Sequence, residues 1–337
     1  MSLKRITGHA AALAGLKAAL LGIRPGHAYL FVGPDGVGKY PTACEAAKML
    51  VCERPQGDAC EACRSCHLAT RSAHPDIHLV QPAEGKRFIS LEQIQELCGQ
   101  YALRPHGPRR VAVIRDADRM TEEAANALLK TLEEPPDWGT LFLTSSRPSA
   151  LPETILSRCQ TLRFGPLSRE DVMAILGKQG SVSPEDARFA AAVADGSAGQ
   201  AAQFLSQGGT ELRQAVLERL ARLTAQDNFD MAAFARDHAA EAGAGLEDRR
   251  AALRRLFQII LRYYRDLMAL QAGLPATALV NASSAPLLTQ QASRLTPWAV
   301  EKAIEITLEA WERLNRNANV NLLLERYFYE LGEAVAA

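Results

Sequence analysis

The segment Gly33-Pro-Asp-Gly-Val-Gly-Lys39 constrains the fold of this chain more than any other. It has the spacing Gly-x4-Gly-Lys, in which glycines let backbone N–H groups converge on phosphate oxygens and the lysine reaches the outer phosphates. A short apolar run at 28–32 precedes it, and a helical pattern from about 41 to 51 follows it. This order of strand, loop and helix predicts a phosphate-binding loop whose nucleotide-binding residues are Gly33, Gly36, Gly38 and Lys39.

Further apolar runs at 76–80, 111–114 and 140–144 alternate with helical patterns, one of which starts at Ser90 and another at Thr121. Strands that alternate with helices predict an α/β domain with a mostly parallel sheet covered on both faces. From about residue 166 the chain reads as successive helices. We therefore expect three parts: a P-loop domain over 1–165, a small helical lid domain over 166–208, and an all-α domain over 209–337.

The chain is electrically balanced, with 38 Lys and Arg residues against 38 Asp and Glu residues among its 337. A global attraction to nucleic acid is therefore not expected, although a local basic patch remains open. No apolar run approaches the roughly 20 residues that span a bilayer, and the first 22 residues lack a signal-peptide cleavage site. We expect a cytoplasmic protein with no membrane association.

The positions that hold Mg²⁺ in active P-loop ATPases carry other residues here. Tyr40 stands where a Ser or Thr hydroxyl is needed, and Arg115 stands where an Asp would follow the strand at 111–114. Asp116 then occupies the place of a water-orienting Glu with a shorter side chain. The loss of both metal-holding residues predicts that the Mg²⁺ site and the intrinsic ATPase activity are gone. Two alternatives stay open for the loop itself: it binds ATP or ADP at Lys39, or it is a glycine-rich turn that binds no nucleotide.

Four of the seven cysteines crowd into fifteen residues, at Cys52, Cys60, Cys63 and Cys66. The Cys-x2-Cys steps let sulfurs approach one tetrahedral Zn²⁺, and four ligands leave no open position, so a structural zinc site over about 52–70 is expected. Free thiols in an insertion are the alternative. A zinc ribbon that binds DNA is a weaker hypothesis, because only three cations lie nearby: Arg54, Arg64 and Arg71.

Several segments together resemble one family. The stretches 30–39 and 126–136 (Asn-Ala-Leu-Leu-Lys-Thr-Leu-Glu-Glu-Pro-Pro) and the triplet Ser157-Arg158-Cys159 are similar to those of AAA+ clamp-loader subunits of bacterial DNA polymerase III. Residues 314–321 resemble the C-terminal collar domain of one subunit type of that loader. The resemblance implies a RecA-like AAA+ domain with a zinc module, a helical lid and an oligomerising collar.

The resemblance also implies roles for individual residues. Arg158 would reach the ATP of a neighbouring subunit as an arginine finger, a role worth roughly 10³–10⁵ in rate in other phosphoryl-transfer systems. Ser145 and Ser146 lie where the family carries its first sensor, and Gln200 stands where the second sensor is usually an arginine. Gln200 is thus a third departure at the chain's own nucleotide site.

The function implied is that of a non-hydrolysing subunit in a hetero-pentamer with gamma/tau-type ATPase and delta-type subunits. The assembly would open a sliding clamp and place it on primed DNA, as part of a DNA-directed DNA polymerase holoenzyme. One alternative is an active ATPase subunit of the same loader. Another alternative is a P-loop nucleotide kinase. The 126–136 segment and the all-helical C-terminal part argue against it.

Overall fold

A computed structural model describes residues 2–22, 26–178, 180, 182–223, 228–243, 245–316 and 318–336. The chain forms two compact units. Unit 1 comprises residues 1–175 together with 196–200, and unit 2 comprises 176–195 together with 201–337. The three-part division at 165 and 208 stays a prediction.

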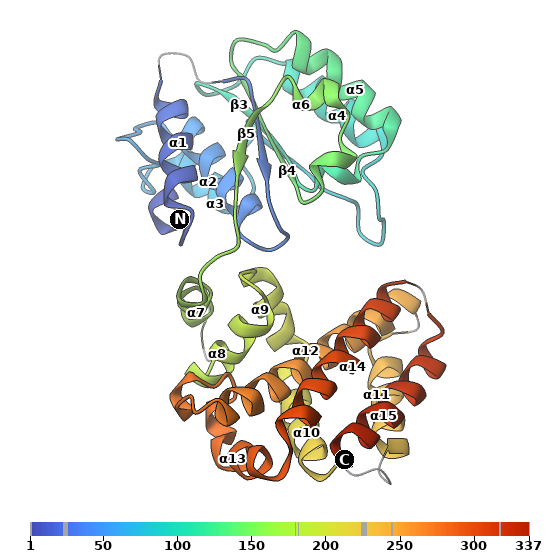
Figure 1. The fold of residues 1–337 in the computed structure, drawn as a ribbon. Helices are drawn as coiled ribbons and strands as arrows, with labels where there is room; N and C mark the ends of the chain where they lie inside the picture. The colour runs from blue at the N-terminus through green and yellow to red at the C-terminus, as the bar shows by residue number, and fades with distance from the viewer. Residues whose placement is uncertain are drawn as a thin grey trace. The chain divides into compact units, whose positions relative to one another are not determined.

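Unit 1 is built on a parallel sheet of five strands in the order β2-β3-β4-β1-β5 (Figure 1). The three strands in the middle of the sheet are buried along their whole length. Their residues are mostly apolar or small, and the buried Arg110 of β3 is paired with the buried Asp76. The α/β, RecA-like architecture expected from the sequence is confirmed. The strands are β1 (Ala28–Val32), β2 (Ile77–Val80), β3 (Arg110–Ile114), β4 (Gly139–Ser145) and β5 (Gln160–Arg163).

Alternate residues of the strands point to two separate cores, one on each face of the sheet. Helices α1 (Ala10–Leu21) and α2 (Lys39–Val51) share one core with the cysteine-rich segment and α3 (Arg64–Thr70). Helices α4 (Leu91–Ala102) and α5 (Glu122–Glu133) share the other core with the short helix α6 (Glu153–Leu156). The sheet is therefore covered on both faces, as parallel sheets require.

The helix starts on the second face are set by capping side chains. Ser90 Oγ accepts from Gln93 N while Gln93 Oε1 accepts from Ser90 N, which is the reciprocal capping box that the sequence predicts. Thr121 Oγ1 accepts from Ala124 N at the start of α5. Short 3-10 turns complete the unit: η1 (Leu3–Arg5), η2 (Ala117–Arg119) and η3 (Pro148–Ala150).

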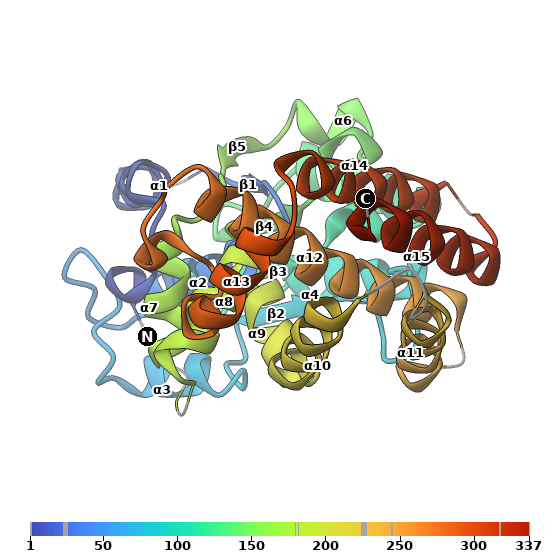
Figure 2. The ribbon, with the colours of Figure 1, turned by 60° about the horizontal axis from the view of Figure 1, so that its bottom comes forward.

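Unit 2 is helical throughout its described residues. Its centre is α12 (Leu246–Gln271), against which α11 (Asn228–Glu241), α13 (Ala285–Arg294) and α14 (Pro297–Asn315) pack (Figure 2). This arrangement confirms the all-α C-terminal region. The remaining elements that follow β5 are α7 (Arg169–Lys178), α8 (Pro184–Val193), α9 (Ala198–Ser206), α10 (Gly209–Arg222), η4 (Ala276–Ala278), η5 (Ala282–Ser284) and α15 (Val320–Ala336).

A buried carboxylate organises one corner of unit 2. Asp266 is fully buried in α12 and accepts hydrogen bonds from the backbone N–H groups of Val280 and Asn281 and from the Arg265 guanidinium. The Asn281 side-chain amide also donates to it, so the charge is compensated by four donors, which is the condition for burying it. In the part of the chain that the structure describes, no helix is long and apolar enough to cross a membrane.

Candidate functional site

The glycine-rich loop runs from the end of β1 to the start of α2, in the context that the sequence predicts. Gly33 has φ +154°, and a Cβ on it would lie 2.0 Å from the carbonyl oxygen of Phe164, so no other residue fits there. Gly33 N also donates to Ser145 O over 3.3 Å, which ties the loop to the end of β4. The close packing of the loop against two neighbouring strands fixes its backbone.

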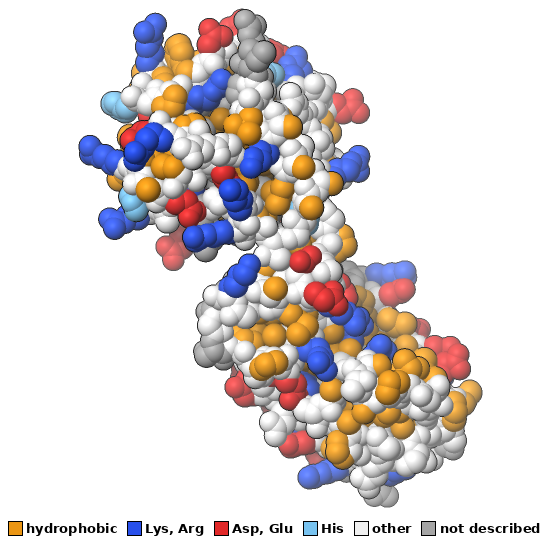
Figure 3. Space-filling model, turned by 90° about the vertical axis from the view of Figure 1, so that its left-hand side faces the viewer, with side chains coloured by type: hydrophobic (Ala, Val, Ile, Leu, Met, Phe, Trp, Pro, Cys, Tyr) orange, Lys and Arg blue, Asp and Glu red, His pale blue; other side chains and the backbone are white. Residues whose placement is uncertain are grey.

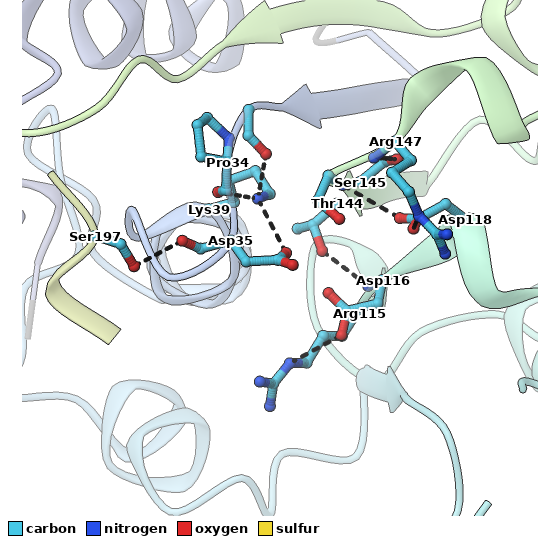
Figure 4. Close-up of polar contacts among 12 residues, drawn as sticks. Pro34, Asp35, Lys39, Arg115, Asp116, Asp118, Thr144, Ser145, Arg147 and Ser197 are labelled. Atoms are coloured by element: carbon cyan, nitrogen blue, oxygen red, sulfur yellow. Dashed lines mark hydrogen bonds and ion pairs between the residues drawn. The ribbon is translucent and has the colours of Figure 1, made fainter. Parts of the chain in front are cut away.

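Lys39 lies folded onto the loop that precedes it. Its Nζ donates to the carbonyl oxygens of Gly33 at 2.7 Å and Pro34 at 2.6 Å, and it lies 3.9 Å from Asp35 Oδ1 (Figure 4). Only 5% of the residue is exposed, and this burial lowers the pKa of the Lys39 ammonium, an effect that Asp35 opposes. A phosphate group would have to replace the two carbonyl contacts as the partner of Lys39.

Residues 196–200 lie directly on the loop. Ser197 Oγ donates to Asp35 O at 2.7 Å (Figure 4). Gly199 N donates to Gly36 O at 2.9 Å. Gly199 approaches so closely that a Cβ on it would lie 2.8 Å from the Gly36 Cα. Gln200, which the sequence placed at the predicted second sensor position, donates its backbone N–H to Ser197 Oγ. The loop carbonyls are therefore occupied by partners from within the chain.

The two residues that replace the Mg²⁺-holding groups lie against each other. The Arg115 guanidinium carbon is 5.1 Å from the centroid of the Tyr40 ring, a cation–π distance. Burial raises the pKa of the Tyr40 hydroxyl to about 12, and the neighbouring Cys44 thiol adds to the rise. The Arg115 Nε also lies 3.7 Å from Asp116. A neutral phenol and a guanidinium offer no ligand to a divalent cation, so these residues do not fit Mg²⁺.

The ends of β3 and β4 are joined by short polar contacts. Asp116 has a left-handed backbone, and its N–H donates to Thr144 Oγ1 at 3.0 Å. Asp118 accepts from Ser146 N at 3.2 Å and from Arg147 Nε at 3.3 Å, so the carboxylate is already paired (Figure 4). The buried Ser145 accepts from Arg147 N through its Oγ. Both residues at the predicted first sensor position thus take part in this network.

Two members of that network, Thr144 and Asp118, were not singled out by sequence reasoning. Thr144 is the penultimate residue of the buried strand β4, and a buried hydroxyl there indicates a hydrogen-bond partner at the end of the neighbouring strand. Asp118 follows Asp116 by two residues in a segment that reads as a turn. The spacing alone gives no indication that Asp118 would bond to the residues after β4.

Arg158 lies on the surface after α6, outside the loop network. Its Nη2 donates to Glu133 Oε1 at 2.8 Å and its Nη1 donates to Thr154 O at 2.9 Å. The Arg158 side chain is 35% exposed and the Glu133 side chain 50% exposed. The guanidinium is thus oriented by a backbone carbonyl of the preceding helix α6 and by a half-exposed carboxylate.

The four clustered cysteines converge as the sequence predicts. Their sulfur atoms all lie within 4.8 Å of one another, and Cys60 Sγ is 4.0 Å from Cys66 Sγ. A tetrahedral site with Zn–S bonds of about 2.3 Å needs sulfur atoms roughly 3.8 Å apart, so the donor set fits one such ion. The cluster is assembled from the end of α2 (Cys52), a loop (Cys60) and the start of α3 (Cys63 and Cys66).

Backbone donors favour the thiolate form of Cys60, whereas burial raises the pKa values of the Cys52 and Cys66 thiols in the absence of a metal. Cys60 N donates to Cys52 Sγ at 3.3 Å, and Cys66 N donates to Cys63 Sγ at 3.4 Å. The backbone N–H of Ala62 is the main cause that lowers the pKa of the Cys60 thiol to about 6. Thiolates are the form that binds metal. The cluster can therefore hold a metal ion such as zinc.

The parallel sheet, the glycine-rich loop and the cysteine cluster define a P-loop protein of the α/β class whose four clustered sulfur atoms could hold a metal ion. Two family models match the chain: "DNA polymerase III, delta subunit" over residues 8–168, and "DNA polymerase III, delta subunit, C terminal" over residues 210–332.

Individual relatives point to one subunit type. DNA polymerase III subunit delta-prime of Bacillus subtilis is 32% identical over 311 residues, which are 92% of this chain and 92% of that protein. The delta-prime subunit of Escherichia coli is 31% identical over 58% of this chain and 59% of its own length. A gamma subunit-related protein of known structure from Thermotoga maritima aligns over 95% of this chain and 98% of its own, with 18% identity and a TM-score of 0.46. The chain belongs to the delta-prime family of DNA polymerase III subunits. Its residues 314–321 resemble the collar domain of this same subunit type.

Proposed function

We propose that this chain is a non-hydrolysing clamp-loader subunit that supplies Arg158 to the ATP of a neighbouring subunit. Its partners would be gamma/tau-type ATPase subunits and delta-type subunits in a hetero-pentamer. The ATP-driven assembly would open a sliding clamp and place it on primed DNA. Membership of the delta-prime family supports the place in the loader.

The observation that carries the non-hydrolysing part is the stacking of Arg115 on Tyr40. Phosphoryl transfer in P-loop enzymes depends on Mg²⁺ held by a hydroxyl and a carboxylate. Here a phenol and a cation stand at those positions, and Asp118 is paired with Ser146 and Arg147. ATP or ADP without a metal remains a ligand that the loop could take if Lys39 left the carbonyls of Gly33 and Pro34.

Two features of Arg158 support the arginine finger. The residue is at the surface, and its partner Glu133 is itself half exposed, so a phosphate of higher charge can replace that carboxylate at small cost. The bond to Thr154 O would persist and hold one side of the guanidinium fork in place. A finger acts in trans only if its guanidinium is oriented and still exchangeable.

Further assignments complete the proposal. Zn²⁺ would sit among Cys52, Cys60, Cys63 and Cys66 as a structural ion. The N-terminal P-loop domain, the lid over 166–208 and the collar over 209–337 would act as in other loader subunits, with the collar forming the oligomer contacts. Ser145 and Ser146 would keep the sensor position without serving a hydrolysis reaction of this chain.

The test is the ATPase rate of a reconstituted loader stimulated by clamp and primed DNA. We expect Arg158→Ala to lower the stimulated ATPase rate, by up to about 10³-fold if Arg158 is the main finger. The decrease would be smaller if arginine fingers of other subunits sustain part of the total rate. Arg163→Ala, which removes a cation from the neighbouring strand β5, is the matched control and should leave the rate unchanged. Equal rates for the wild-type loader and the Arg158→Ala loader would refute the finger.

A second measurement separates the rival functions. Purified chain alone should show no Mg²⁺-dependent turnover of ATP, whereas an active ATPase subunit would turn it over. A nucleotide kinase would instead transfer phosphate from ATP to a small-molecule acceptor. Detection of either activity in the isolated chain would refute the non-hydrolysing proposal while leaving the family membership intact.

A further inference from the structure

The surface around the cysteine cluster gathers cations from three separate stretches of the chain. Arg54, Arg64 and Arg71 belong to the cluster segment itself, and all three are exposed. The structure adds Lys4 from η1 and Lys17 from α1. Figure 3 faces the side of unit 1 that carries α1 and α3 and shows many Lys and Arg side chains there, with fewer Asp and Glu side chains between them. We call the set Lys4, Lys17, Arg54, Arg64 and Arg71 the basic flank.

The N-terminal cations are brought to the cluster by specific contacts. The buried Asp58 accepts from Leu3 N and from Lys4 N, both at 3.3 Å, and Leu3 packs in the same core as the cysteines. Lys17 lies over the cluster loop, since its Cε is 3.9 Å from where a Cβ of Gly57 would be. Residues distant in sequence therefore share one surface, which is why the sequence shows only part of it.

The basic flank is poorly compensated by carboxylates. Arg5 pairs with Glu61 at 3.2 Å, and the buried Lys48 pairs with Glu45 and Glu61, so these charges balance among themselves. Among the described residues, no carboxylate lies within ion-pair distance of the five cations of the basic flank. Between residues 52 and 71 the single exposed carboxylate is Glu53. Hydrogen bonds from Ser65 are the main cause that lowers the pKa of Glu53, and the charges of Arg54 and Arg64 add to it, so one carboxylate faces part of the flank without forming an ion pair.

The helix α3 gives part of the flank a regular spacing. Arg64, His67 and Arg71 are separated by three and four residues, so they lie along one exposed face of the helix. The seven steps from Arg64 to Arg71 correspond to a rise of about 10 Å, which matches roughly three nucleotides along one strand. Two guanidinium groups at this spacing can each contact a different phosphate.

The character of the flank favours phosphate over a protein partner. Stable protein interfaces have an apolar or aromatic centre, but the only large exposed apolar side chain in the described part of residues 1–71 is Leu21. Three of the five cations are arginines, whose planar fork binds phosphate oxygens in pairs. We propose that the basic flank binds the phosphate backbone of a nucleic acid, independently of the arginine finger and of the phosphate loop.

The test is fluorescence anisotropy of a labelled oligothymidylate of about 20 nucleotides, titrated with the purified full chain between about 50 and 200 mM salt. Binding through five phosphates should give a slope of log K against log salt near −3.5. The triple variant Arg54→Gln, Arg64→Gln and Arg71→Gln should lose about two units of that slope and roughly tenfold or more in affinity at the lower salt.

Two further variants separate the flank from general effects of charge or folding. Replacing the same three arginines with lysines keeps the charge and should keep the slope. A matched triple variant on unit 2, Arg313→Gln, Arg316→Gln and Arg326→Gln, removes three surface cations that each pair with a glutamate and should bind like wild type. Metal content and thermal unfolding of each variant establish that the module is intact.

Three outcomes would overturn the proposal. They are an absence of oligonucleotide binding by wild-type chain at the lower salt, equal binding by the flank variant and the unit 2 variant, and tighter binding of a poly-glutamate peptide than of the oligonucleotide. The last would assign the flank to an acidic protein segment. Single-stranded DNA, duplex DNA and RNA share the phosphate chemistry, and parallel titrations with each rank them.

Discussion

The guanidinium of Arg158 donates to the carboxylate of Glu133 across 2.8 Å. This contact joins the two segments that most strongly mark the family, 126–136 and 156–159. Glu133 lies at the last position of α5, and Arg158 follows α6. The pair is half exposed and is therefore worth no more than about 1 kcal/mol of stability. Such a weak ion pair orients the Arg158 side chain and can still be exchanged for another anionic partner at small cost in free energy.

Replacing Glu133 with Gln should test whether this carboxylate is only a resting partner for Arg158. Because the finger needs to leave Glu133, we expect Glu133→Gln to leave loader ATPase at or above the wild-type rate, while Arg158→Gln lowers it. Both variants should unfold within about 1 kcal/mol of wild type in urea. If the two variants lower the rate equally, the ion pair itself is what matters and the finger is wrong.

Restoring the metal ligands should restore metal-dependent binding. We expect Tyr40→Thr combined with Arg115→Asp to give the isolated chain Mg²⁺-dependent affinity for a fluorescent ATP analogue, because a hydroxyl and a carboxylate replace the stacked pair. Either single change leaves one position unsuitable and should not do so. The measurement is a nucleotide titration with Mg²⁺ and with a chelator. Mg²⁺-dependent binding by the unaltered chain would contradict the account.

Removing one sulfur should release the metal and loosen the module. Cys66→Ser takes away a buried member of the four-sulfur set, so the purified variant should lack the roughly one equivalent of zinc that we expect in the wild-type chain. The N-terminal residues held by Asp58 should then become more sensitive to protease. Cys98→Ser is the control, because Cys98 bonds Thr131 elsewhere in unit 1. Full zinc content in Cys66→Ser, measured by mass spectrometry, would argue against the site.

The approach of residue 199 to the loop should make that glycine irreplaceable. An alanine Cβ would lie 2.8 Å from Gly36 Cα, so Gly199→Ala must push the segment from the loop, at a cost of about 1–3 kcal/mol in the free energy of unfolding. Gly99→Ala, inside α4 with open space around it, should instead stabilise by about 0.5–1 kcal/mol. Urea denaturation measures both. Similar effects of the two changes would show that the close approach does not matter.

Acid should weaken the fold through His74. Burial lowers the pKa of this imidazole below its ordinary 6.5, an effect that Asp76 partly opposes, and His74 Nδ1 accepts from Asp76 N. The unfolded chain therefore takes up the proton first, so the stability present above pH 6.5 falls as the pH drops towards the folded-state pKa. His74→Gln should flatten this dependence. The exposed His67→Gln should keep the wild-type profile of unfolding free energy against pH.

Most strands and helices of unit 1 could be predicted because local pattern and tertiary structure agree there. The apolar runs of β1, β3 and β4 are buried on both sides, and the capping side chains of Ser90 and Thr121 start the helices where expected. β5 was not predicted. Its sequence, Gln160-Thr-Leu-Arg163, is largely exposed at the edge of the sheet, so no apolar pattern marks it.

The candidate site was predictable in its parts rather than in its contacts. The residue types at Tyr40 and Arg115 indicated a lost metal site, but their stacking depends on two elements meeting at the end of the sheet. The contact of Gly199 with Gly36 joins residues more than 160 positions apart. The same holds for Lys4 and Lys17, whose place beside the cysteine cluster follows from the buried Asp58 and from packing.

The chain passes between the two units three times, after residues 175, 195 and 200. A shortened protein that ends at residue 175 would therefore lack Ser197 and Gly199, and with them two donors to the phosphate loop. In such a fragment the carbonyl oxygens of Asp35 and Gly36 would lack these donors, so its measured nucleotide affinity would not represent the loop of the intact chain. Dissection of this protein by truncation or limited proteolysis should keep residues 196–200 attached.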